Sequence, residues 1–274
     1  MCPDVLITGC SSGIGLEAAQ TLRRRGWRVI AACRAQDDVD RRQAEGFDAV
    51  RLDYADPASV DEGWRAALTL TGGRMDALFN NGGHGMSGAV EDVSRAALEH
   101  VFHSNVFGLH QLTRLAIPVM LAHGGGRIVQ HSSVVGIAPL RWRGAYVATK
   151  HALEGLTKTM RVELRGTGVH LSLLNTGPVT SRFRQNSSAQ FERWIAADTS
   201  RHAEFYRTVF MAHRTNTGPA PFERPPSAVV RRLIHALEAS RPRLRYYITP
   251  PSYVAAALIR LLPDRVQDWV VSRI

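Results

Sequence analysis

Short apolar segments alternate with longer segments of helical periodicity from the amino end to about Pro178. Uninterrupted apolar runs bounded by turn residues are typical of strands that are buried on both faces of a parallel sheet. The runs predict strands over residues 5–7, 27–33, 49–52, 77–79, 127–130, 169–174 and 244–249.

Between these runs, apolar residues recur at the spacing of an amphipathic helix. Ser227 is expected to cap the last of the predicted helices. Strands that alternate with helices form βαβ units. We therefore expect an α/β fold: a single doubly wound Rossmann-type domain whose parallel sheet carries helices on both faces. The helices are predicted over residues 14–25, 57–70, 94–121, 145–165 and 227–239.

The alternation of strands and helices stops after Pro178. Residues 181–226 are rich in arginine, aromatic residues and proline, and we interpret them as a partly helical insertion that caps a substrate pocket. The predicted organisation is one domain over residues 1–250, which includes this insertion, followed by an amphipathic tail over residues 251–274.

The composition is that of an ordinary globular protein with an unusual charge balance. With 45% apolar and 21% charged residues among 274, the chain is neither collagen-like nor disordered. The formal net charge is +10, and only Lys150 and Lys158 are lysines, so arginine dominates the basic residues. This excess is compatible with a nucleic acid, an anionic membrane or a phosphorylated ligand. Because no aromatic RNA-binding motif and no basic recognition helix accompany it, we expect no nucleic-acid partner.

The predicted tail combines positive charge with apolar residues. Arg260 and Arg265 flank an apolar run, which makes the tail a candidate for peripheral contact with an anionic membrane. The alternative is a solvated amphipathic helix that packs on the domain.

Cysteine and histidine usage argues against disulfides and metal sites. Cys2, Cys10 and Cys33 lack the spacing of a disulfide framework or a zinc site, and the amino end does not resemble a signal peptide. We therefore expect a cytoplasmic location, with peripheral membrane association as the alternative that the tail leaves open. The eleven histidines form no ligand motif, so no metal is expected.

A glycine-rich loop follows the first predicted strand. The segment Thr8–Gly15 reads TGCSSGIG and leads into the first predicted helix, where a dinucleotide pyrophosphate binds in Rossmann-type folds. The same residues also fit the G-x-S-x-G elbow of serine hydrolases, with Ser11 as the nucleophile. A cofactor-binding regulator without turnover is a further alternative.

The end of the second predicted strand bears on which dinucleotide binds. An NAD site usually carries an acidic residue there for the ribose 2′-hydroxyl. This chain has Arg34, whose guanidinium suits a 2′-phosphate. We therefore expect NADP(H) to be preferred over NAD(H). Asp53, after the third strand, is a candidate for binding adenine or for capping the helix near Pro57.

Candidate catalytic residues gather around one predicted helix start. Tyr146 and Lys150 are four residues apart and share a helix face. An ammonium group near a phenol lowers the pKa of the phenol, which yields a proton donor and acceptor. Ser133 could hydrogen-bond a substrate oxygen beside Tyr146. Asn105 is a poor helix former in mid-helix and suggests a specific polar contact.

Together these residues resemble the short-chain dehydrogenase/reductase family over about residues 4–182. The matching stretches are Thr8–Gly15, Asn80–Gly83 (NNGG, where the family usually has NNAG), Asn105, Ser133, Tyr146-x-x-x-Lys150 and Gly177–Thr180. The chain looks most like the group of 17β-hydroxysteroid dehydrogenase type one and retinol dehydrogenases. The segments that support this closer resemblance are 5–16, 168–173 and 243–246.

The resemblance implies a mechanism and a set of site residues. Tyr146 would exchange a proton with the substrate oxygen, Lys150 would lower the pKa of Tyr146 and hold the nicotinamide ribose, Ser133 would polarise the carbonyl, and Asn105 would hold a relay water. The glycine in place of alanine in this NNGG segment is expected to matter little. The implied cofactor-binding residues are Gly9, Ser11, Ser12, Gly13, Ile14, Gly15, Arg34, Asp53, Asn80, Gly82, Tyr146, Lys150, Pro178, Val179 and Thr180.

The expected substrate is a hydrophobic primary or secondary alcohol, or its aldehyde or ketone. A steroid, a retinoid and a fatty aldehyde all fit this description. The resemblance also implies a homodimer or homotetramer that assembles through the two long helices. The predicted substrate-binding residues are Ser133, Val135, Leu140, Trp142, Tyr146 and Phe183.

Overall fold

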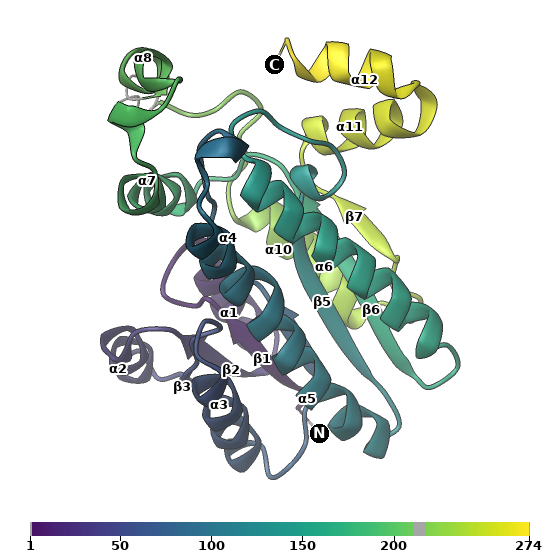
Figure 1. Ribbon diagram of the computed structural model, residues 1–274. Helices are drawn as coiled ribbons and strands as arrows, with labels where there is room; N and C mark the ends of the chain where they lie inside the picture. Colours follow the sequence, from purple (N-terminus) through teal and green to yellow (C-terminus); the bar gives the residue numbers. More distant parts are fainter. Residues whose placement is uncertain (1, 211–217, 274) are drawn as a thin grey trace.

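A seven-stranded, all-parallel sheet forms the centre of the computed structural model, which describes residues 2–210 and 218–273. The strand order is β3-β2-β1-β4-β5-β6-β7, so the chain winds outward from β1 to one edge and then from β4 to the other (Figure 1). The strands are β1 (Asp4–Thr8), β2 (Arg28–Cys33), β3 (Asp48–Arg51), β4 (Ala77–Asn80), β5 (Gly126–Ser133), β6 (Val169–Thr176) and β7 (Arg245–Tyr247).

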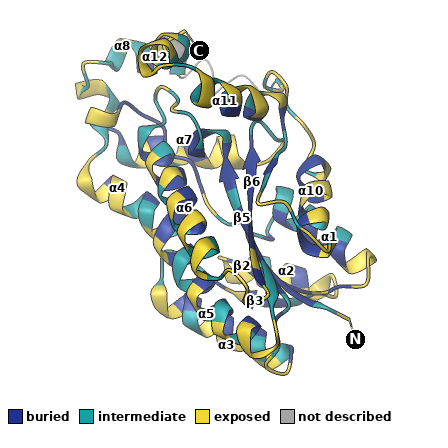
Figure 2. Cartoon of the chain, turned by 90° about the vertical axis from the view of Figure 1, so that its right-hand side faces the viewer, coloured by how far each residue is buried: buried dark blue, intermediate teal, exposed yellow. Residues whose placement is uncertain are grey.

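Helices cover both faces of this sheet, as expected for a doubly wound fold. One face is covered by α1 (Gly13–Arg24), α2 (Gln36–Ala44) and α10 (Ser227–Glu238). The other face is covered by α3 (Pro57–Leu70), α4 (Arg95–Phe102), α5 (Gly108–Ala122) and α6 (Gly144–Glu163), as Figure 2 shows. The predicted fold class, a single Rossmann-type α/β domain, is confirmed.

The strands form where the sequence has its uninterrupted apolar runs. Every residue of β1 and of β4 is buried, because helices lie on both sides. Each face then has its own apolar core, one around Leu22 and Leu233 and one around Leu109 and Leu112. Adjacent parallel strands end at the same edge of the sheet, and this edge carries the candidate site.

Three local expectations are corrected by the structure. Helix α2 was not predicted, because its nine residues bury only Val39 and Arg42 and so show little apolar periodicity. The helix predicted over residues 94–121 is divided into α4 and α5 by a π-helical turn over His103–Phe107. Ser227 is the first residue of α10 and makes no capping hydrogen bond.

The insertion after β6 folds over the carboxyl edge of the sheet. It contains α7 (Phe183–Trp194) and the short α8 (Ala203–Phe205), so its predicted helical character is confirmed where it is described (Figure 1). Residues 211–217 of the predicted insertion lie outside the described residues. Val179 and Arg224 pair as an isolated bridge, which joins the two ends of the insertion.

The carboxyl-terminal tail forms two helices, α11 (Pro250–Leu261) and α12 (Asp264–Val271). α11 packs against β7 and the turn after β5, while Leu261 and Trp269 are 78% and 58% exposed. In the part of the chain that the structure describes, no helix combines the length and apolar character needed to cross a bilayer. Peripheral membrane contact through the tail stays a prediction.

Candidate active site

The glycine loop between β1 and α1 has the geometry of a phosphate cradle. Gly9 and Gly13 adopt positive φ angles of 71° and 58°, a conformation that glycine tolerates best. A Cβ on Gly15 would lie 2.2 Å from the Gly9 carbonyl oxygen, so only glycine allows this close approach. No side chain caps α1, and its first turn carries no acidic residue. Free N–H groups and the positive end of the helix dipole therefore suit an anionic pyrophosphate.

Arg34 stands directly after β2 with an exposed side chain that makes no hydrogen bond or ion pair to any described residue. Asp53 accepts a hydrogen bond from the Ala55 amide at 3.0 Å, within its own turn. The cap of α3 is Asp56, whose carboxylate accepts from the Ala58 and Ser59 amides. The capping alternative for Asp53 is therefore wrong.

The segment after β4 is fixed to β1 through Thr8, whose carbonyl accepts from the Asn81 side chain at 2.9 Å. Thr8 Oγ1 accepts hydrogen bonds from the amides of Asn81 and Gly82 at 2.9 and 3.0 Å. Asn80 is fully buried, where it accepts from the Tyr54 hydroxyl at 2.6 Å and donates to Thr113 at 2.9 Å. The Asn80 side chain thus holds the strand end in place rather than facing a cofactor.

Asn105 lies in the π-helical turn between α4 and α5 and is fully buried. Its Oδ1 accepts from the His84 amide at 3.1 Å, and its Nδ2 donates to the His84 carbonyl at 2.8 Å and to Thr149 at 3.2 Å. All of these partners are protein groups, so the side chain positions the loop. A Cβ on Gly83 would lie 2.9 Å from Asn105 Oδ1. A side chain at position 83 would therefore crowd Asn105. The residue that departs from the NNAG pattern is Gly82 rather than Gly83, and a Cβ there would lie 3.0 Å from the Tyr54 ring.

Tyr146 and Lys150 occupy successive turns of α6, both buried, and Ser133 closes β5 opposite them. Burial raises the pKa of Tyr146 to about 12, against the weaker opposite effects of the Ser133 hydroxyl and the Arg143 charge. The Lys150 ammonium lies 5.7 Å from the centre of the Tyr146 ring. Desolvation outweighs the neighbouring charges at this position.

Lys150 is held by the main chain of β5. Its Nζ donates to the His131 carbonyl at 2.7 Å, and burial lowers its pKa to about 8. The His131 ring bridges Asn81 at 2.9 Å and Thr176 at 2.9 Å, so it joins the ends of β4, β5 and β6. Burial lowers the pKa of His131 to about 3, and the ring is therefore neutral at physiological pH.

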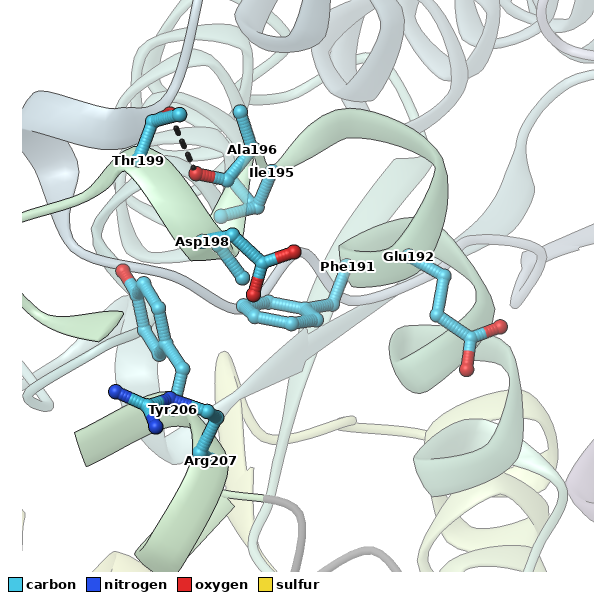
Figure 3. Close-up of a pocket in the computed structure, with 9 residues that line it drawn as sticks. Phe191, Glu192, Ile195, Ala196, Asp198, Thr199, Tyr206 and Arg207 are labelled. Atoms are coloured by element: carbon cyan, nitrogen blue, oxygen red, sulfur yellow. Dashed lines mark hydrogen bonds between the residues drawn. The ribbon is translucent and has the colours of Figure 1, made fainter. Parts of the chain in front are cut away.

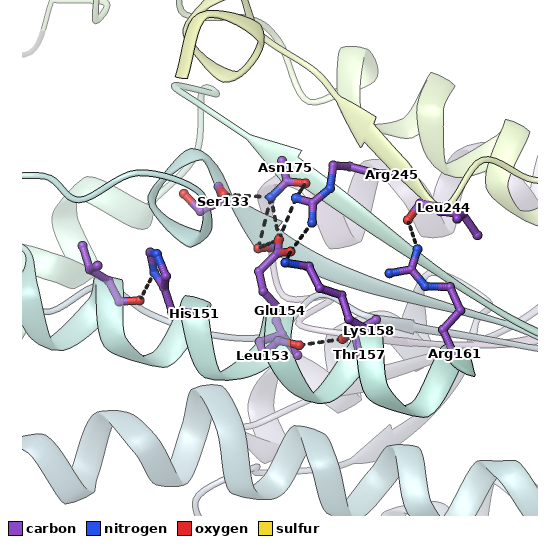
Figure 4. Close-up of polar contacts among 12 residues, drawn as sticks. Ser133, His151, Leu153, Glu154, Thr157, Lys158, Arg161, Asn175, Leu244 and Arg245 are labelled. Atoms are coloured by element: carbon purple, nitrogen blue, oxygen red, sulfur yellow. Dashed lines mark hydrogen bonds and ion pairs between the residues drawn. The ribbon is translucent and has the colours of Figure 1, made fainter. Parts of the chain in front are cut away.

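A buried polar network around Glu154 lies next to Ser133 (Figure 4). The Glu154 carboxylate accepts from Ser132 at 2.8 Å and from Asn175 at 2.7 Å, and it forms an ion pair with Arg245. Asn175 also donates to the Ser133 carbonyl at 3.0 Å. The network therefore connects α6, β5, β6 and β7 at the catalytic edge.

The predicted substrate-binding residues are distributed over several environments. The Phe183 ring lies 5.3 Å from the Tyr146 ring and is partly exposed. Trp142 instead stacks on Phe205 at 4.3 Å, inside the cap. Val135 is buried, and Leu140 lines a hollow of about 410 Å³ between its loop and α12.

A second cavity, of about 430 Å³, lies within the cap itself (Figure 3). Phe191, Ile195 and Tyr206 line it, and Tyr146 lines neither this cavity nor the hollow beside α12. Of the predicted set, Phe183 and Ser133 are therefore the residues that lie beside the Tyr146 side chain.

Several site residues were missed in the sequence. His131, Thr176 and Glu154 are polar residues within or at the end of segments with a strand or helix pattern, and that is the signal that could have revealed them. Arg143 was missed because arginines are common throughout this chain.

Comparison with known proteins agrees with this geometry. A family profile described as short chain dehydrogenase matches residues 4–192. The uncharacterized oxidoreductase YbbO of Escherichia coli strain K12 is 41% identical over 98% of this chain and 93% of that protein. Human 17-beta-hydroxysteroid dehydrogenase type 1 is 33% identical over 89% of this chain and 77% of its own, and human retinol dehydrogenase 8 is 30% identical over 88% and 79%.

A solved structure has the same architecture. A short chain dehydrogenase/reductase from Burkholderia phymatum in complex with NAD superposes with a TM-score of 0.78 and 27% identity, over 99% of this chain and 95% of that one. The chain belongs to the short-chain dehydrogenase/reductase family, whose members bind NAD or NADP and are generally oligomeric. Its resemblance to the group of hydroxysteroid and retinol dehydrogenases is confirmed.

Membership in this family makes the chain an oxidoreductase. The serine hydrolase interpretation is therefore wrong, and Ser11 makes no hydrogen bond to a histidine or carboxylate among the described residues. The alternative of a regulator without turnover is likewise set aside, because the matching relatives are oxidoreductases.

Proposed function

We propose that this protein interconverts a hydrophobic alcohol and its ketone or aldehyde, using NADP(H) in preference to NAD(H). The observation that carries the proposal is the gathering of Ser133, Tyr146 and Lys150 at the carboxyl edge of the sheet, beside the glycine cradle. The apolar ring of Phe183 next to Tyr146 supports a substrate with an apolar body. The direct test is NADPH consumption with a panel of hydrophobic aldehydes and ketones.

Each catalytic residue has a role in this proposal. The Tyr146 hydroxyl gives its proton to the substrate oxygen during reduction, and Ser133 donates a hydrogen bond to the same oxygen. Lys150, anchored on the His131 carbonyl, stabilises negative charge on the phenol and holds the nicotinamide ribose. A bound NADP(H) would supply or accept the hydride that this reaction needs. Asn105, in the π-helical turn, would hold the water of the proton relay.

The cofactor cradle in this proposal uses main-chain groups more than side chains. The loop from Gly9 to Gly15, including Ser11, Ser12 and Ile14, would hold the pyrophosphate, and Asp53 and Gly82 would hold the adenosine. Pro178, Val179 and Thr180, which follow β6, would hold the nicotinamide part. The Thr180 hydroxyl donates to Glu223 at 2.7 Å and the Thr180 amide donates to the Arg224 carbonyl at 3.0 Å, so Thr180 would contribute to this side of the site mainly by its position.

Replacing the proposed phosphate-binding arginine should change the cofactor preference. Arg34→Asp removes a charge-assisted contact to the 2′-phosphate and adds repulsion, so the ratio of kcat/KM for NADPH to that for NADH should fall about 100-fold. The same change at Arg65, exposed on α3, is the matched control and should leave the ratio unchanged. An unaltered ratio in Arg34→Asp would show that another group selects the cofactor.

The raised pKa of Tyr146 predicts different pH profiles for alcohol oxidation and carbonyl reduction. Its phenol stays protonated near neutrality and is ready to donate during reduction, whereas oxidation needs the phenolate. Between pH 6 and 7.5, where Lys150 keeps its charge, alcohol oxidation should rise about tenfold per pH unit and carbonyl reduction should stay nearly flat. Initial rates with saturating cofactor measure both, and a flat oxidation profile would contradict this assignment.

A further inference from the structure

The loop that leads into α6 places a guanidinium beside the candidate catalytic tyrosine. Arg143 directly precedes α6, three residues before Tyr146, so the two side chains lie on the same face of the helix start. The Arg143 charge acts on the Tyr146 phenol, and the Tyr146 phenol acts on Arg143 in return. A group bound by Arg143 would therefore sit close to the reacting carbonyl.

Arg143 is anchored through one of its three nitrogens. Its Nη1 donates to Ser187 on α7 at 3.0 Å and to Ser87 in the loop after β4, and both serines are almost fully buried. The two serine hydroxyls also bond to each other at 2.9 Å. The guanidinium is therefore held in a fixed orientation between the cap and the sheet.

The opposite edge of the guanidinium has no partner. Arg143 Nε and Nη2 make no hydrogen bond to any residue that the structure describes, and neither is a buried unpaired atom, unlike Nε and Nη1 of Arg42. These donors keep contact with solvent. The same Nε and Nη2 edge binds a carboxylate elsewhere in the chain, where Arg25 contacts Glu238 at 2.9 and 2.5 Å.

Arg143 also lacks a counter-ion. No carboxylate of the described residues lies within ion-pair distance, and the charged neighbour that acts on it most, Arg184, is positive. Burial lowers the pKa of Arg143, which reflects the loss of water around its charge. Removing a guanidinium from water costs several kcal/mol unless an anion compensates. A fixed, partly desolvated fork of two donors beside the catalytic hydroxyl is suited to a planar anion.

We propose that Arg143 is a specificity-determining residue that binds a carboxylate of the substrate near the carbonyl that Tyr146 protonates. The preferred substrates are then oxo acids whose apolar part lies against Phe183. This inference rests on the proposed oxidoreductase function and narrows its substrate class from hydrophobic carbonyl compounds to those that also carry an acid.

A series of matched substrates tests the proposal on the full-length protein with NADPH. The 2-, 3- and 4-carboxybenzaldehydes vary the distance between the aldehyde and the acid, and their methyl esters lack the charge. We expect kcat/KM for the acid to exceed that for the ester by about tenfold or more for at least one isomer. In Arg143→Gln, which can still donate to the serines, this acid-to-ester ratio should fall to about one. In Arg143→Lys the ratio should lie between those of the unaltered protein and Arg143→Gln.

Arg141→Gln is the matched control. Arg141 lies two residues away, is exposed, and donates to the Ser272 carbonyl of the tail, so the acid-to-ester ratio should match that of the unaltered protein. If Arg143 only fastened the cap, its replacement would change acids and esters equally and the ratio would persist. A persistent ratio in Arg143→Gln, or a ratio near one for all isomers in the unaltered protein, would overturn the proposal.

A binding measurement separates this proposal from the proposed function. Benzoate should raise the melting temperature of the NADP-bound protein more than neutral benzamide does, and Arg143→Gln should abolish the difference. Equal shifts in the unaltered protein would also overturn the carboxylate site. If the aldehyde group of the methyl esters is reduced in a Tyr146-dependent reaction but acids are not preferred, only the carboxylate site is rejected. No reduction of any substrate would reject the proposed function itself.

Discussion

Tyr146→Phe should lower kcat about 1000-fold or more while NADPH still binds within about threefold of its normal affinity. The substitution removes only the hydroxyl that exchanges a proton with the substrate oxygen. The phenyl ring keeps its packing against Phe183 at 5.3 Å and its place in the first turn of α6, so the cofactor cradle is undisturbed. NADPH absorbance measures turnover, and fluorescence titration measures cofactor binding.

A matched control separates chemistry from a general effect of losing a hydroxyl. Tyr253 on α11 is 50% exposed and lies outside the site, so Tyr253→Phe should leave kcat unchanged. Turnover of Tyr146→Phe within about tenfold of the unaltered protein would mean that another group donates the proton.

The fold was predictable because its strands are buried on both faces. The apolar runs of β1, β2 and β4 appear in the sequence as uninterrupted segments, and their alternation with helices admits few topologies. Helix α2 escaped prediction because it covers the edge of the sheet and buries only two side chains, one of them Arg42. Where little apolar surface is buried, the sequence carries little periodic signal.

The site was predictable as a set of residues but not as an electrostatic environment. The motif residues Ser133, Tyr146 and Lys150 are indeed brought together at one edge. The pKa of Tyr146 depends on how completely surrounding segments exclude water, and this depends on the cap and on tertiary packing rather than on residue spacing. The same holds for Trp142, which its position alone assigned to the substrate pocket and which packs instead against Phe205.

Residues that position the catalytic groups could not be recognised from sequence motifs, for a related reason. The His131 ring and the Glu154 carboxylate act through partners that are distant in sequence, such as Asn81 and Arg245. Only the register of β5 against β6 shows that Ser133 lies opposite Thr176 and that the ends of these strands share one network. Buried polar groups that satisfy one another in this way fix a single arrangement of the site.

The Glu154 network should therefore carry a large share of the stability of the catalytic edge. Glu154→Met leaves Arg245 without a counter-ion and leaves Ser132 and Asn175 without their acceptor, so the free energy of unfolding should fall by about 3–5 kcal/mol. Urea unfolding at a fixed protein concentration measures this loss. Lys158→Met is the control, because Lys158 is exposed and lies 3.8 Å from the same carboxylate, and it should cost less than about 1 kcal/mol.

The double variant Glu154→Met with Arg245→Met distinguishes the effect of an unpaired buried charge from the effect of lost side-chain packing. Removing both charges leaves no unpaired ion, so the double variant should be more stable than the sum of the two single losses predicts. The Glu154 charge also raises the pKa of Lys150 against the effect of burial, so its removal should reduce the charged fraction of Lys150 near neutral pH and lower kcat there. Additive losses, or Glu154→Met within about 1 kcal/mol of the unaltered protein, would show that packing rather than this network holds the catalytic edge together.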